Sequence, residues 1–123
     1  MMDRDTWLSR ILGAIRDLAD EYYQERVWVR AQGPEVDSST EALVRLLHDY
    51  ELHAFIAEAG DKAWLSDDQL AALRALEHAL ERYAAHDHGS GGDAARIASP
   101  AWRKIRKLAN ATIETFAARA ASA

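Results

Sequence analysis

Apolar residues recur every three or four positions between residues 5 and 26, which is the spacing of one face of a helix. They are Trp7, Ile11, Ile15, Leu18 and Tyr22. Asp3 or Asp5 stands where a helix N-cap belongs. The next residues, Val27–Val29, are either a short extended piece or the frayed end of this helix.

Two further helices are predicted over residues 40–59 and 67–86, where leucines repeat with helical period. Ser66 and Gln69 have the spacing of a capping box, in which each side chain accepts a hydrogen bond from the other residue's backbone N–H. Ser38 and Glu41 have the same spacing at the start of the helix predicted over residues 40–59. The capping residues therefore indicate where both helices begin.

A fourth helix is predicted over residues 100–120, because Ser99 can cap it and Pro100 suits the first helical position. The glycine-rich residues before it indicate a flexible loop over residues 86–98. Four amphipathic helices with short connections predict an all-α fold. We expect an antiparallel bundle of about four helices, in one domain that spans residues 1–123.

Composition is typical of a globular protein: hydrophobic residues make up 49% of the chain. There is no cysteine, which excludes disulfides, cysteine nucleophiles and cysteine-ligated zinc. No apolar run is long enough to span a membrane, and the acids near the N-terminus are untypical of a signal peptide. These features predict a cytoplasmic protein that contacts no membrane.

The net charge of −5 is unevenly distributed along the chain. Residues 35–87 carry −8, whereas residues 1–34 carry −1 and residues 88–123 carry +4. A segment at −8 attracts a basic partner and repels nucleic acid. The alternative is that these acids form an ordinary solvated helix surface.

Catalytic motifs are absent from the sequence. It contains neither a Gly-x-Ser-x-Gly nucleophile motif nor a phosphate-binding loop, and no Glu-x-x-His pair of the kind found in di-iron bundles. His86 and His88 lie beside a glycine-rich stretch without a third metal ligand at useful spacing. We therefore expect no enzymatic activity, no metal and no cofactor.

The aromatic residues divide into two groups. Trp7 and Trp102 lie on apolar stripes and are predicted to be core residues. Trp28 and Trp64 lie in connections, where each either caps the end of the bundle or forms an exposed anchor for a partner. A tyrosine beside carboxylates, such as Tyr50, is typical of a protein-binding surface.

A small, acidic, cysteine-free helical protein with tyrosines beside carboxylates resembles the immunity proteins that neutralise bacterial toxins in contact-dependent inhibition and colicin-type systems. Residues 46–52 (LLHDYEL), 64–70 (WLSDDQL) and 99–102 (SPAW) also look like uncharacterised bacterial helical proteins of this size. The resemblance implies a stoichiometric inhibitor, monomeric or dimeric when free, whose acids enter the basic cleft of a cognate toxin domain such as a nuclease. The candidate partner-binding residues are Asp49, Tyr50, Glu51, Glu58, Asp61, Asp67 and Asp68.

Two alternatives remain open at the level of sequence. One is a homo-oligomeric or scaffold protein in which Trp28 and Trp64 pack across a symmetric interface. The other is a bundle that binds a small ligand or a metal in its interior, with His48, His53 and Tyr50 lining the site.

Overall fold

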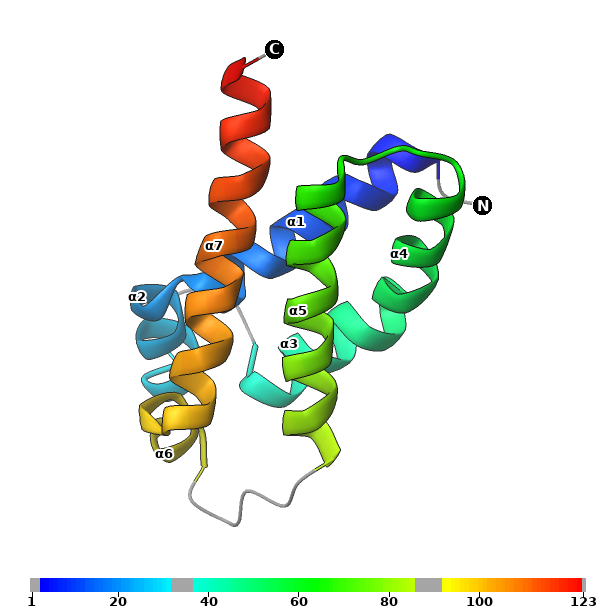
Figure 1. Cartoon of the computed structure of the whole chain (residues 1–123). Coiled ribbons are helices and arrows are strands. Elements are labelled where there is room, and N and C mark those ends of the chain that lie inside the picture. Colours follow the sequence, from blue (N-terminus) through cyan, green and yellow to red (C-terminus); the bar gives the residue numbers. More distant parts are fainter. Residues whose placement is uncertain (1–2, 32–36, 86–91, 123) are drawn as a thin grey trace.

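The computed structural model describes residues 3–31, 37–85 and 92–122, and every regular element within these ranges is helical (Figure 1). No helix in them is long and apolar enough to cross a membrane. The all-α prediction is confirmed. The elements are α1 (Arg4–Ala19), α2 (Glu21–Tyr23), the π-helical segment η1 (Gln24–Val29), α3 (Ser39–Val44), the π-helical segment η2 (Arg45–Asp49), α4 (Leu52–Asp61), α5 (Asp67–Ala85), α6 (Gly92–Ala98) and α7 (Pro100–Ser122).

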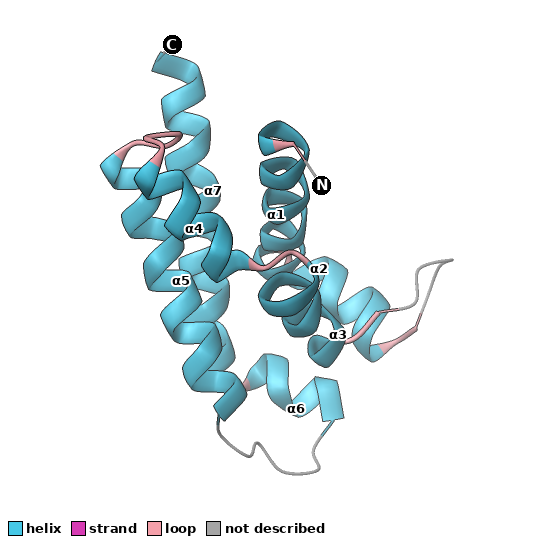
Figure 2. Cartoon of the chain, turned by 90° about the vertical axis from the view of Figure 1, so that its right-hand side faces the viewer, coloured by secondary structure: helices cyan, strands magenta, loops and turns pink. Residues whose placement is uncertain are grey.

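Helix α5 lies at the centre of the arrangement, with α4 packed on one side and α7 on the other (Figure 1). These three helices alternate in direction along the chain, as neighbours in an antiparallel bundle do. Helix α1 instead crosses behind α5 and α7, as Figure 2 also shows, and packs against α7 and η2. The fold is therefore an all-helical assembly that contains more segments than the four predicted.

The predicted helix over residues 5–26 is interrupted at Asp20, whose backbone is extended with φ −98° and ψ 94°. The Asp20 carboxylate accepts a hydrogen bond of 3.0 Å from the backbone N–H of Tyr23, and thereby caps α2. The chain then continues directly into η1. Residues 27–29 are consequently helical, which excludes the extended alternative.

The break after α1 leaves carbonyl groups that need a donor, and Gln24 supplies it. Its side chain is fully buried and donates hydrogen bonds of 2.9 and 2.8 Å to the carbonyl oxygens of Asp17 and Leu18. Its own amide oxygen accepts from the Trp102 indole at 3.1 Å. One buried glutamine thus joins the end of α1 to α7.

The predicted helix over residues 40–59 is also two pieces, because Glu51 has the left-handed backbone φ 48° and ψ 57°. Residues 92–98, predicted as part of a flexible loop over 86–98, form α6 and bury Ile97. That prediction is wrong for residues 92–98, because they form a helix and Ile97 packs in the core. Residues 86–91 lie outside the described residues.

The capping predictions at Ser66 and Ser99 are confirmed, and the Ser38 hydroxyl accepts from the Glu41 N–H at 3.1 Å. The Ser66 backbone N–H donates to the Gln69 side chain at 2.9 Å, and the Gln69 N–H donates to the Ser66 hydroxyl at 3.2 Å. At the start of α7, the Trp102 N–H donates to the Ser99 hydroxyl at 3.2 Å. These bonds fix the first turns of α5 and α7.

Two groups of aromatic rings fill the core. Trp102 is fully buried and makes edge contacts with Trp28 and Tyr83, at ring-centroid distances of 5.7 and 5.2 Å. Phe55 packs between Trp7 and Trp64 at 5.0 and 6.0 Å. Trp28 is only 6% exposed, so it is a core residue and not an exposed anchor, and the symmetric interface through Trp28 is excluded.

The apolar stripe predicted for the first helix holds only as far as α1 extends. Ile11, Ile15 and Leu18 are buried, whereas Tyr22 is 76% exposed. The break at Asp20 changes the direction of the chain and turns Tyr22 away from the core. The helical period of α1 therefore does not predict which side chains are buried beyond Asp20.

Candidate functional site

Among the described residues, the carboxylates that are candidates for a functional site lie in three settings, and the first is a buried cluster around Asp37. The Asp37 side chain is 3% exposed and accepts hydrogen bonds from the Tyr23 hydroxyl at 2.9 Å, the Trp28 indole at 3.0 Å and the Arg45 guanidinium at 2.9 Å. Arg45 also lies 3.8 Å from the carboxylate of Asp17. The cluster therefore joins α1, α2, η1 and the start of η2.

The pKa values of the two carboxylates that face Arg45 are shifted in opposite directions. Burial alone would raise the pKa of Asp37, but hydrogen bonds from Arg45, Trp28 and Tyr23 outweigh it and lower that pKa. Burial and the nearby charge of Asp37 raise the pKa of Asp17. Arg45 therefore stabilises the charged form of Asp37 more than that of Asp17.

An open pocket of about 510 Å³ lies over this cluster. It is lined by Arg10, Gly13, Ala14, Asp17, Tyr23, Asp37, Arg45 and Tyr50. Tyr50, a candidate partner-binding residue, belongs to this pocket, and its backbone oxygen accepts a 2.7 Å hydrogen bond from the Trp7 indole. The structure therefore places Tyr50 against α1 and beside Arg45.

The second setting is formed by the other candidate partner-binding residues, which lie at the two ends of α4. Asp49 and Glu51 precede the helix, and we call them the first acidic group. The second acidic group lies where α4 ends and α5 begins, and consists of Asp61, Asp67 and Asp68. A ten-residue helix is about 15 Å long. The residues predicted to form one surface are therefore two groups separated by the length of α4.

All residues of both acidic groups are exposed, and none of them forms an ion pair with another described residue. Glu58 differs, because its carboxylate lies 2.7 Å from the Lys62 amine. Lys62 and Arg4 also lie over the half-buried Trp64, 5.3 and 5.9 Å from the ring centroid. Trp64 therefore caps the α4 end of the core.

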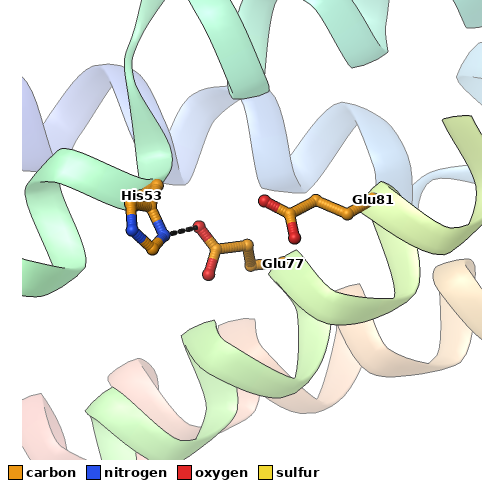
Figure 3. A group of neighbouring side chains, drawn as sticks. All are labelled: His53, Glu77 and Glu81. Carbon is orange, nitrogen blue, oxygen red and sulfur yellow. Dashed lines mark hydrogen bonds and ion pairs between the residues drawn. The ribbon is translucent and has the colours of Figure 1, made fainter. Parts of the chain in front are cut away.

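The third setting joins α4 to α5 through His53, Glu77 and Glu81. Figure 3 shows the His53 ring directed at Glu77, with the Glu81 carboxylate beside it. His53 Nδ1 lies 3.1 Å from Glu77 Oε2, and one potential ligand atom from each of the three residues lies within 4.8 Å of the others. The residues thus form a cluster of one imidazole and two carboxylates.

Sequence reasoning did not find this cluster. Glu77 and Glu81 are four residues apart and share a face of α5, but only the packing of α4 on α5 brings His53 to them. His53 and His48 are both exposed, so the alternative of a site in the bundle interior lined by these histidines is wrong.

No family model, no curated protein and no solved structure matches the chain.

Proposed function

We propose that the protein is a stoichiometric binding protein that neutralises a basic partner domain, in the manner of an immunity protein bound to its toxin. The observation that carries the proposal is the exposure of five carboxylates at the ends of α4, without ion pairs to other described residues. Unpaired exposed carboxylates produce an external negative potential that steers a basic partner.

The distribution of the basic residues supports the same proposal. Arg45 is held by Asp37 and Asp17, and Arg106 lies 3.8 Å from Glu21. The exposed bases of α7 lie on a helix separated from α4 by α5 (Figure 1). Among the α7 residues whose side chains are described, they are Arg103, Lys104 and Lys107. These bases therefore do not neutralise the acidic groups, although Lys62, Arg4 and Arg74 lie near the end of α4 and offset part of the charge of the second acidic group.

The two acidic groups set a geometric requirement on the partner. Because they are separated by the length of α4, about 15 Å, a partner that contacts both needs two basic patches at that separation. A basic cleft with cations on both walls meets this requirement. A nuclease domain, whose cleft binds phosphates, is the partner class that we favour.

The test is affinity capture from the native host with three forms of the full-length protein. One form is wild type, and the second replaces both acidic groups by Asn or Gln. The third is a control that removes the same charge outside α4 and α5, by neutralising Asp5, Glu21, Glu25, Glu41 and Glu114.

The proposal predicts a basic protein that is recovered with wild type and with the control but lost with the variant of the acidic groups. Equal recovery with all three forms would contradict it. If wild type recovers only further copies of itself, measured as a mass that rises with concentration, the homo-oligomer alternative replaces the proposal.

A further inference from the structure

We infer that His53, Glu77 and Glu81 form a binding site for a divalent transition-metal ion of the zinc type. This inference is independent of the partner proposed above, because it depends on side chains of this chain alone. The three residues, His53 on α4 and Glu77 and Glu81 on α5, bring one nitrogen and two carboxylate oxygens together (Figure 3). Zinc commonly takes imidazole and carboxylate ligands and accepts water as a fourth.

The backbone that carries the ligands is held by the core. On α4, Leu52 and Phe55 beside His53 are fully buried. On α5, the buried Leu76 and Leu80 precede Glu77 and Glu81 directly. Neighbouring buried residues fix both helices, so the ligands start close together and little backbone order is lost on binding.

The side chains need only a small movement to reach coordination distances. Ligand atoms about 2.0–2.2 Å from one zinc ion lie roughly 3.3–3.6 Å apart, and the three atoms already lie within 4.8 Å of one another. The His53 side chain is 82% exposed, and Glu81 is exposed, so both can rotate. Glu77 is 12% exposed and already in contact with the imidazole, so it is the fixed member.

Charge favours a cation at this position. Glu77 and Glu81 are like charges four residues apart on one helix, an arrangement that destabilises the helix unless a cation is near. Neither carboxylate forms an ion pair with a Lys or Arg of the described ranges. A divalent ion replaces the repulsion by two attractive contacts, and the imidazole favours zinc over magnesium or calcium.

The experiment is calorimetric titration of tag-free, full-length protein with Zn²⁺, and separately with Mg²⁺. We expect one saturable Zn²⁺ site, a rise in Tm when Zn²⁺ is present, and no comparable response to Mg²⁺. His53→Ala and Glu77→Gln should each weaken Zn²⁺ binding at least about tenfold, because the loss of even an outer-shell partner commonly has that effect. Both variants change side chains at the surface of the helix pair.

Two controls separate this site from other histidines. His78→Ala removes an exposed imidazole next to Glu77 in sequence that is not part of the cluster of three ligands, and should leave binding unchanged. The double variant His86→Ala/His88→Ala should also bind as wild type does. Absence of saturable Zn²⁺ binding, unchanged binding by His53→Ala, loss of binding only in the His86/His88 variant, or equal binding of Mg²⁺ would each overturn the inference.

Discussion

Asp37 is 3% exposed and accepts hydrogen bonds from Tyr23, Trp28 and Arg45. Asp49 and Glu51 lie in the same acidic segment of the chain, but they are exposed and form no ion pair with a described residue. The first carboxylate holds helices together, and its charge is neutralised where it lies. The other two project their charge into solvent, where a partner can respond to it.

The comparison shows that net charge alone does not identify a binding surface. Residues 35–87 carry −8, but this figure does not show which acids are paired: Asp37 lies against Arg45 and Glu58 against Lys62. Only the unpaired acids contribute strongly to the external potential. The predictions that follow test this division between carboxylates that stabilise the fold and carboxylates that bind.

The largest effect is expected from Asp37→Asn. The substitution leaves a partly buried Arg45 without its main partner, and loss of one member of a buried ion pair typically costs about 3–5 kcal/mol. We expect the free energy of unfolding, measured by urea denaturation, to fall by about 3 kcal/mol. This value is at the lower end of the range because Asp17 retains some contact with Arg45. Asp17→Asn is the matched control and should change stability by less than about 1 kcal/mol. Equal effects of the two substitutions would contradict the assignment.

Acid should remove the contribution of Asp37. Its pKa is lowered in the folded protein, so the stability that it provides is present above the ordinary value of 3.8 and is lost as the pH falls through the folded pKa. The stability difference between wild type and Asp37→Asn should therefore be constant near neutral pH and shrink below pH 3.8. Urea denaturation from pH 7 to pH 2 measures it. A difference that is independent of pH would show that the loss is steric.

The pKa of Asp17 is raised, so its ionisation changes the stability of the fold in the opposite direction to the ionisation of Asp37. Ionisation of Asp17 disfavours the folded state, so this contribution to stability improves as the pH falls through the raised pKa. Asp17→Asn should remove that improvement, and a comparison of its pH profile with the wild-type profile checks the sign.

A gain in stability of about 1 kcal/mol is expected from Glu51→Gly, because Glu51 occupies the left-handed region that glycine adopts without strain. Ala63 has nearly the same backbone angle, φ 53°, but carries no charge, so Ala63→Gly is the control. Both substitutions should raise Tm, whereas only Glu51→Gly should weaken partner binding. If both substitutions weakened partner binding, or if neither did, the assignment of Glu51 to the binding surface would be wrong.

The smallest effect is expected at Glu58. Its pair with Lys62 lies at the surface with a spacing of four residues, which is worth roughly 0.3–0.5 kcal/mol. Glu58→Gln should lower the free energy of unfolding by no more than this amount, and less at high salt. A loss of about 2 kcal/mol or more would place Glu58 with Asp37 among the structural carboxylates.

The helices could be predicted wherever local capping and periodicity determine them. Ser66 with Gln69 and Ser99 with Pro100 mark the starts of α5 and α7, because their bonds are made within one turn of helix. The breaks at Asp20 and Glu51 could not be predicted. Apolar residues continue with helical period across both positions, and tertiary packing of each piece on a different neighbour decides the geometry there.

The site residues also divide into those that local sequence predicts and those that contacts between distant segments determine. The exposure of Asp67 and Asp68 follows from their place in the first turn of α5, which sequence indicates, whereas the helix end at Asp49 depends on the break at Glu51. The burial of Asp37 depends on donors from three separate segments, and the cluster of His53 with Glu77 depends on the packing of α4 against α5. Interactions between distant segments leave no signature in a single sequence.

The most direct test of the central claim is the association rate of the captured partner with wild type and with the variant that neutralises both acidic groups, at low and high salt. Exposed charges that steer a partner act mainly on this rate, and salt screens them. We predict that wild type associates rapidly and slows steeply with salt, and that the variant associates slowly at both concentrations while it unfolds at nearly the wild-type Tm. The same rate and the same salt dependence for both proteins would contradict the account.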